Sequence, residues 1–302
     1  MKKDFLTLKD YSRDEIEYIF DLSEKIKKNN NKYSKVLEGK NIAMLFDKHS
    51  TRTRLSFEAG INQLGGKALF LDSKNLQLSR GETYNDTAKI FSMYVDGVII
   101  RTFKQKTVEI FAEYGTIPVI NGLTDTYHPC QALSDMFTLK ELGLLNKDLK
   151  FTYIGDSNNV TNSLIIGFSK MGINITIGSP DKYSPPQEII DYAKNLNEGS
   201  KINVVHDPVG AVSDADVVYT DVWFSMGDEI NDRKILELNS YQVNSELLEN
   251  AKKGVKVMHC LPAHRGEEIT SEVLDGNSSI VLQQAENRIH AQKGLLVYLF
   301  GS

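Results

Sequence analysis

Residues 46–54 read Phe46-Asp47-Lys48-His49-Ser50-Thr51-Arg52-Thr53-Arg54. An apolar run of strand length precedes them at 41–46, and apolar side chains at helical spacing follow at 55–64. Hydroxyl and guanidinium groups therefore gather at the start of a predicted helix, where the first turn leaves its N–H groups without partners. One Ser or Thr there would be explained as a helix cap. Two arginines, two threonines and a serine within five residues exceed that need. The stretch therefore predicts an oxyanion site, with phosphate as the expected anion.

Length and composition indicate a globular protein of two domains. The chain has 302 residues, of which 41% are hydrophobic and 25% charged, so each domain can bury a core. A formal net charge of −5 without a long basic stripe argues against nucleic acid as a partner. No apolar stretch has the length of a membrane span, and the first residues lack the apolar segment of a secretory signal. Two cysteines make no disulfide framework, and the expected location is the cytoplasm.

Short apolar runs alternate with amphipathic stretches along the whole chain, which predicts parallel sheets covered by helices on both faces. Strands are predicted at 41–47, 67–72, 97–102, 117–121, 150–155, 173–179, 201–206, 216–221, 255–260 and 279–283. Helices are predicted at 12–28, 53–64, 86–94, 107–114, 131–143, 160–171, 186–197, 245–253 and 285–300.

The alternation stops at one long helical segment and then restarts, which indicates an α/β fold of two doubly wound parallel-sheet domains joined by interdomain helices. The first domain is expected to cover residues 1–133 and to be completed by the C-terminal helix, 285–302. The second domain is expected to cover 134–284.

Polar clusters follow the predicted strands, and ligands of open α/β sheets bind outside the carboxyl ends of the strands. In the first half these clusters are residues 50–54, 101–102 and 128–131. In the second half they are residues 155–159, 221–227 and 259–266. We expect the two halves to contribute to one interdomain site.

The cluster Gly155-Asp156-Ser157-Asn158-Asn159 lies where a dinucleotide fold carries its glycine fingerprint, but only the first glycine is present. The Asp, Ser and Asn side chains would crowd a pyrophosphate, so no nicotinamide or flavin cofactor is expected. Asn158 or Asn159 alone would equally be explained as the cap of the next helix.

Histidines and cysteines occur as His128-x-Cys130 and His259-Cys260, spacings that match no usual zinc site, so no metal is expected. His128 follows a predicted strand, which favours a ligand-facing role over a purely structural one. A lone thiol such as Cys260 is more often a small buried hydrophobe.

Three charged residues of the last third have an ordinary explanation. Glu267 and Glu268 are expected to be solvated acids in a first helical turn. Arg288 is explained as well by a surface ion pair as by a ligand contact.

Several motifs together resemble the aspartate/ornithine carbamoyltransferase family. They are Phe46-x-x-x-Ser50-Thr51-Arg52-Thr53-Arg54, His128-Pro129-Cys130-Gln131, Asp221-x-Trp223-x-Ser225-Met226-Gly227 and His259-Cys260-Leu261-Pro262. The last two are similar to the ornithine branch, and the resemblance runs from about residue 5 to 300. It implies that the δ-amine of L-ornithine attacks carbamoyl phosphate to give citrulline and phosphate, a step of arginine metabolism. It also implies a homotrimer with shared active sites and no metal or organic cofactor.

The resemblance also implies roles for single residues. The carbamoyl-phosphate site would comprise Ser50, Thr51, Arg52, Thr53, Gln77 (donated by the adjacent subunit), Arg101, His128, Pro129, Cys130, Gln131, Cys260, Leu261 and Arg288. The ornithine site would comprise Asn159, Asp221, Ser225 and Met226. The catalytic residues would be Arg52, Arg101, His128 and Cys260.

The attacking amine must be neutral, although an aliphatic ammonium has a pKa of about 10.4. Asp221 or Cys260 could accept its proton, and the sequence does not decide between them. Competing interpretations are a carbamoyltransferase for another acceptor, such as putrescine or aspartate, and a non-catalytic two-lobed binding protein. The acid Asp221 would repel aspartate, and the Ser225-Met226-Gly227 loop would have no carboxylate to bind in putrescine.

Overall fold

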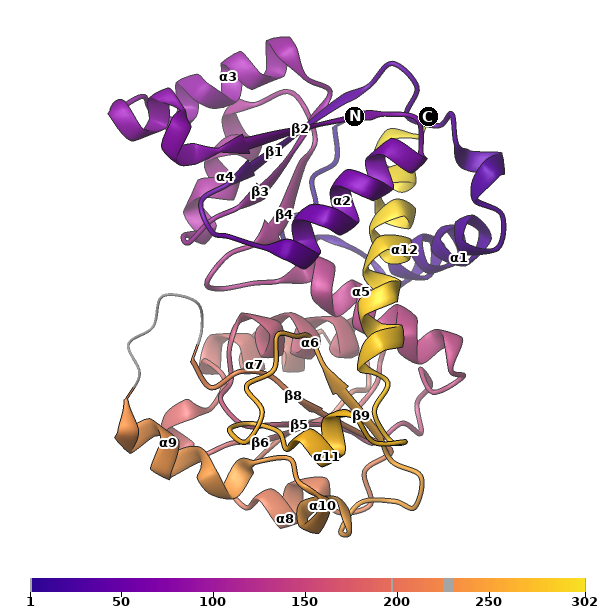
Figure 1. Cartoon of the computed structure of the whole chain (residues 1–302), viewed down its shortest axis with the longest axis vertical. Helices are drawn as coiled ribbons and strands as arrows, with labels where there is room; N and C mark the ends of the chain where they lie inside the picture. Colours follow the sequence, from indigo (N-terminus) through magenta and orange to yellow (C-terminus); the bar gives the residue numbers. More distant parts are fainter. Residues whose placement is uncertain (1, 197, 225–230, 302) are drawn as a thin grey trace. The chain divides into compact units, whose positions relative to one another are not determined.

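The computed structural model describes residues 2–196, 198–224 and 231–301 (Figure 1). The chain divides into two compact units. Unit 1 comprises Met1–Phe137 and Asn287–Ser302, and unit 2 comprises Thr138–Glu286. The chain passes from one unit to the other within helix α5 (Pro129–Glu141) and returns within helix α12 (Val281–Phe300).

Unit 1 contains a four-stranded parallel sheet in the order β2-β1-β3-β4. Its strands are β1 (Asn41–Phe46), β2 (Lys67–Asp72), β3 (Gly97–Arg101) and β4 (Val119–Leu123). Its helices before α5 are α1 (Arg13–Lys28), α2 (Thr51–Gln63), α3 (Tyr84–Tyr94) and α4 (Gln105–Tyr114). Every residue of β3 is buried, as a parallel strand covered on both faces requires.

Unit 2 contains a five-stranded parallel sheet in the order β7-β6-β5-β8-β9. Its strands are β5 (Phe151–Ile154), β6 (Ile175–Gly178), β7 (Ile202–Val205), β8 (Val217–Thr220) and β9 (Lys256–His259). Its helices are α6 (Asn159–Lys170), α7 (Gln187–Asn195), α8 (Pro208–Val212), α9 (Asp232–Leu238), α10 (Ser245–Leu248) and α11 (Ser271–Leu274). Two parallel-sheet α/β units confirm the predicted fold class.

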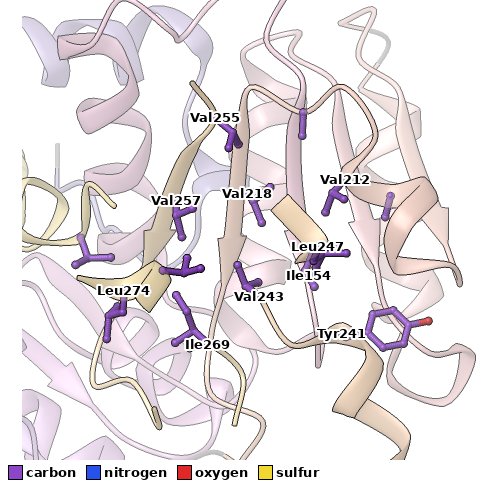
Figure 2. Packing of buried hydrophobic residues seen from close by; sticks show 14 residues of the cluster. Ile154, Val212, Val218, Tyr241, Val243, Leu247, Val255, Val257, Ile269 and Leu274 are labelled. Atoms are coloured by element: carbon purple, nitrogen blue, oxygen red, sulfur yellow. The ribbon is translucent and has the colours of Figure 1, made fainter. Parts of the chain in front are cut away.

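The core of unit 2 shows why these strands pair as they do. On one face, Ile154, Val218 and Val257 from three neighbouring strands point into a cluster that includes Val212 of α8 and Leu247 of α10 (Figure 2). Successive side chains of a strand point to opposite faces of the sheet, so the neighbours of these residues along each strand point to the other face. Burying one such aliphatic side chain stabilises the fold by about 1.5–3 kcal/mol.

One predicted element is wrong. The expected strand at 279–283 is a single β-bridge between Ser279 and Val257, after which α12 begins at Val281. A short apolar run such as Ile280-Val281 fits a strand and a buried helix equally well, so periodicity could not decide. The short helices α8, α9 and α11 were not predicted, because four to seven residues carry too little helical periodicity.

Across the part of the chain that the structure describes, none of the helices combines the length and the apolar character needed to cross a membrane.

Candidate active site

The topology of each sheet marks one place for a ligand. Strand order reverses between β1 and β3 in unit 1, and between β5 and β8 in unit 2. Ligands of open α/β sheets bind outside the carboxyl ends of strands at such a switch point. The polar groups described below follow these strands, so each unit has a candidate site of its own.

In unit 1, helix α2 begins where the sequence predicts the oxyanion site. Ser50 is the N-cap, and its hydroxyl accepts a hydrogen bond from the Thr53 backbone N–H at 3.2 Å. Thr51 is exposed and Arg52 half-buried, whereas Thr53 is 2% exposed. The cap satisfies one N–H of the first turn, and the helix dipole still favours an anion there.

Two buried arginines converge on this helical turn. Thr53 Oγ1 accepts hydrogen bonds from Arg101 Nη1 at 3.5 Å and from Arg288 Nη2 at 3.3 Å. Arg288 Nη1 also donates to Gln131 Oε1, and Gln131 Nε2 donates to Asp135 Oδ1 at 2.8 Å. Arg288 is 4% exposed, so its explanation as a surface ion pair is wrong. Residues 53, 101, 128, 131 and 288 are called the arginine cluster below.

His128 completes the arginine cluster as a neutral group. It is 5% exposed and immediately precedes α5. Burial lowers the pKa of its ring well below the usual 6.5, and the charges of Arg288 and Arg101 lower it further. A neutral imidazole offers one donor and one acceptor rather than a third positive charge.

Three other residues of the predicted phosphate site are arranged differently. Cys130 is buried, its Sγ donates to the Asn121 carbonyl at 3.3 Å, and burial raises its thiol pKa to about 12. Its side chain therefore serves packing inside unit 1. Pro129 is buried as the first residue of α5, and Gln77 is exposed in a 3₁₀ turn at Gln77–Arg80.

In unit 2, Asp221 follows β8 and receives three hydrogen bonds although it is only 5% exposed. Asp221 Oδ1 accepts from Cys260 Sγ at 2.8 Å and from the Val222 N–H at 2.9 Å. Asp221 Oδ2 accepts from Asn158 Nδ2 at 2.7 Å. Asn158, Asp221 and Cys260 are called the Asp221 cluster below.

Asn158 is a residue that the sequence analysis did not assign to the site. It caps α6 by accepting from Val160 and Thr161 backbone N–H groups, and it contacts Asp221 with its amide nitrogen. Asn159, the residue assigned instead, is half-buried in the first turn of α6. Asn-Asn before a predicted helix was the only available signal, and it does not say which Asn is the cap.

The predicted ornithine-site residues Ser225 and Met226 lie outside the described residues. Trp223 and Phe224, which precede them, are buried and pack on Leu238 of α9.

The described residues of unit 2 contain two groups of possible metal ligands: Asp221, His259 and Cys260, and His264, Glu267 and Glu268. Ligand atoms of Asp221, His259 and Cys260 lie within 4.8 Å of one another. His259 Nε2 contacts Glu268 Oε1 at 2.9 Å, and its Nδ1 accepts from the Leu261 N–H at 2.8 Å. Both ring nitrogens are engaged, so the geometry fits a hydrogen-bonded network better than a metal site. Glu268 is fully buried, and its prediction as a solvated acid is wrong.

Two family models match consecutive parts of the chain. Residues 3–141 match the carbamoyl-P binding domain of aspartate/ornithine carbamoyltransferase, and residues 147–299 match its Asp/Orn binding domain. The chain therefore belongs to the aspartate/ornithine carbamoyltransferase family.

Individual proteins similar to this chain are named ornithine carbamoyltransferase. An ornithine carbamoyltransferase of Oceanobacillus iheyensis is 51% identical over 98% of this chain and 94% of its own. The structure of ornithine carbamoyltransferase from Pyrococcus furiosus has a TM-score of 0.95 and 45% identity, covering 99% of this chain and 97% of that one. The anabolic ornithine carbamoyltransferase of Campylobacter jejuni has a TM-score of 0.93 and 42% identity, covering 99% of both chains.

Proposed function

We propose that this chain transfers the carbamoyl group of carbamoyl phosphate to the δ-amine of L-ornithine, giving L-citrulline and phosphate. The observation that carries the proposal is that the two units hold sites of opposite charge. Unit 1 has the cationic arginine cluster, and unit 2 has the acidic Asp221 cluster. Relatives named ornithine carbamoyltransferase at about half identity support it.

Carbamoyl phosphate is the ligand proposed for unit 1. Its phosphate would be held by the first turn of α2, with Ser50, Thr51, Arg52 and Thr53, where the helix dipole and guanidinium groups favour an anion. Arg101 and the neutral His128 would donate to the carbonyl oxygen, which becomes negative as the amine attacks. The Arg52 guanidinium and the first turn of α2 would stabilise the negative charge that the departing phosphate gains.

Ornithine is the ligand proposed for unit 2. The Asp221 side chain is oriented by three donors and would pair with the δ-ammonium group. The ammonium group loses one proton before its nitrogen attacks the carbonyl carbon. We propose that this proton leaves through the Asp221–Cys260 pair, because Cys260 Sγ already lies 2.8 Å from Asp221 Oδ1. Since the neutral amine becomes more abundant as pH rises, kcat/KM for ornithine should increase toward alkaline pH.

A product assay tests the acceptor. Purified protein would be given carbamoyl phosphate with ornithine, putrescine or aspartate in turn, and the ureido product measured. We expect product with ornithine and at most a trace with the other two amines. No product with ornithine would refute the proposed function, and product with putrescine alone would identify the alternative acceptor.

We also propose a homotrimer in which Gln77 reaches the active site of the adjacent subunit. Gln77 is exposed on unit 1, and α3, the next α-helix along the chain, exposes the large apolar side chains of Met93 (74% exposed) and Tyr94 (73% exposed). Light scattering should give three times the chain mass. Unfolding and refolding a mixture of two inactive variants, Gln77→Ala and Arg101→Met, should restore activity only if subunits share sites. A monomer, or no restoration, would contradict the shared site.

Two broader proposals follow from this activity. The reaction fits a step of arginine biosynthesis, testable by growth of an arginine-requiring host that expresses the chain. A cytoplasmic location agrees with two free cysteines, Cys130 and Cys260, and is testable by cell fractionation.

A further inference from the structure

A buried acid supports the turn that carries Cys260. Glu268 is 0% exposed and His259 is 1% exposed. Glu268 Oε1 accepts hydrogen bonds from His259 Nε2 at 2.9 Å and from the His264 backbone N–H at 2.6 Å. His259 Nδ1 accepts from the Leu261 backbone N–H at 2.8 Å. A backbone N–H can only donate, so Nδ1 carries no hydrogen, and the proton of the neutral ring is on Nε2, directed at Glu268.

The backbone of the same histidine is fixed from another element. The His259 N–H donates to Gln284 Oε1 at 2.9 Å, and Gln284 Nε2 donates to the Tyr219 hydroxyl at 3.3 Å. His259 is thus held through both its ring and its backbone. The next residue, Cys260, is the one whose thiol donates to Asp221.

Burying an acidic side chain in order to hold a turn has a cost in free energy. A carboxylate removed from water is unfavourable unless its hydrogen bonds compensate. Oε1 of Glu268 accepts both of these hydrogen bonds, whereas Oε2 is buried and has no hydrogen-bond partner among the described residues. Such a residue is better explained by what it orients than by the stability that it adds.

We propose that Glu268 is a positioning residue for the ornithine site. Through the His259 ring it fixes the Leu261 N–H, and thereby directs the Cys260 thiol to Asp221. The proposal rests on the proposed function of the Asp221 cluster. Without the Glu268 bond the ring can rotate, and the Leu261 N–H loses its acceptor.

A matched pair of substitutions separates positioning from packing. Glu268→Gln keeps an oxygen that can accept both hydrogen bonds, whereas Glu268→Met has similar length and no acceptor. We expect Glu268→Met to raise KM for ornithine about tenfold, the effect of losing one hydrogen bond, and to change KM for carbamoyl phosphate less than about twofold. Glu268→Gln should lower the melting temperature but keep both KM values within about twofold. The control Glu267→Gln makes the same change at a partly exposed acid, 3.5 Å from His264, and should alter neither KM.

Thiol alkylation gives a readout that needs no activity. The rate for Cys260, followed by mass spectrometry without substrates, should rise severalfold in Glu268→Met and stay unchanged in Glu268→Gln. Cys130 is buried and should stay slow in both, which reports an intact fold. Because this rate is independent of citrulline formation, failure of the proposed function would leave it intact.

Three outcomes would overturn the proposal: wild-type KM and alkylation in folded Glu268→Met, equal losses in both Glu268 variants, or altered KM in Glu268→Gln alone. If Glu268→Met does not fold, His259 provides the same comparison. His259→Asn retains an oxygen able to accept from the Leu261 N–H, and His259→Leu does not. Equal KM for ornithine in these two variants would also overturn it.

Discussion

The arginine cluster and the Asp221 cluster occupy the same topological position in two similar sheets and carry opposite charge. In unit 1 the groups are Thr53, which follows β1, and Arg101, the last residue of β3, joined by Arg288 from α12. In unit 2 the groups after β5 and β8 are Asn158 and Asp221, joined by Cys260 after β9. Both places are created by the reversal of strand order, and the residue types then decide whether an anion or an amine is bound.

The comparison also separates two kinds of buried charge. The guanidiniums of unit 1 lie around a hydroxyl and a helix N-terminus, which leaves a positive field for an incoming anion. The carboxylate of unit 2 is already bonded by three donors and has to exchange or share one of them with a cationic substrate. Four predictions test this difference, from the largest effect to the smallest.

Arg101→Met should lower kcat/KM by about 10²–10³, because it removes a buried donor to the developing oxyanion. Steady-state kinetics with both substrates would measure it. The control Arg13→Met removes a surface arginine paired with Glu17 and should leave the kinetics unchanged. A loss smaller than about threefold in Arg101→Met would mean that the arginine cluster is not the anion site.

Asp221→Asn should lower kcat/KM for ornithine by about 10², since truncating one charge of a buried pair costs about 2–5 kcal/mol. Binding of carbamoyl phosphate, measured by calorimetry, should change little. The exposed Asp191, bonded to Gln187, offers the matched control Asp191→Asn. Equal losses of affinity for both substrates would contradict the assignment of carbamoyl phosphate to the arginine cluster and of ornithine to the Asp221 cluster.

Thr53→Val should weaken carbamoyl phosphate binding about tenfold, because the hydroxyl that accepts from both Arg101 and Arg288 is removed while the side-chain shape is kept. Calorimetry with carbamoyl phosphate would measure the change. Ornithine-analogue binding should be unaffected, and a selective loss there would contradict the assignment.

The free energy of unfolding should depend on pH because the pKa of His128 is lowered in the folded protein. Burial, with Arg288 and Arg101, lowers its folded pKa below the unfolded value near 6.5. The unfolded chain therefore binds the extra proton first, and the free energy of unfolding should fall by about 1 kcal/mol as pH drops from about 7.5 to 5.5. Denaturant unfolding of wild type and His128→Asn would measure this, and an unchanged slope in the variant would contradict it.

The parts predictable from sequence are those encoded locally. Buried parallel strands are apolar runs such as 41–46 and 97–101, and the predicted oxyanion site directly follows one of them in the sequence. Arg101 ends a strand, and His128 and Asp221 follow strands, so the rule that ligands bind outside the carboxyl ends of strands indicates them from the sequence alone.

The remaining features depend on contacts between distant residues. Glu267 and Glu268 look alike in sequence, yet only Glu268 is buried against His259. Asn158 rather than Asn159 reaches Asp221, 63 residues away. Arg288 meets Thr53, 235 residues away, so no local pattern could distinguish it from a surface arginine.

Soaking crystals with a bisubstrate analogue, in which a phosphonate is joined to the δ-nitrogen of ornithine, tests the central claim most directly. The account predicts the phosphonate at the first turn of α2, within hydrogen-bonding distance of Arg52 and Arg101, and the ornithine portion in contact with Asp221 and Cys260. A phosphonate bound elsewhere, or an ornithine portion that contacts neither Asp221 nor Cys260, would contradict it.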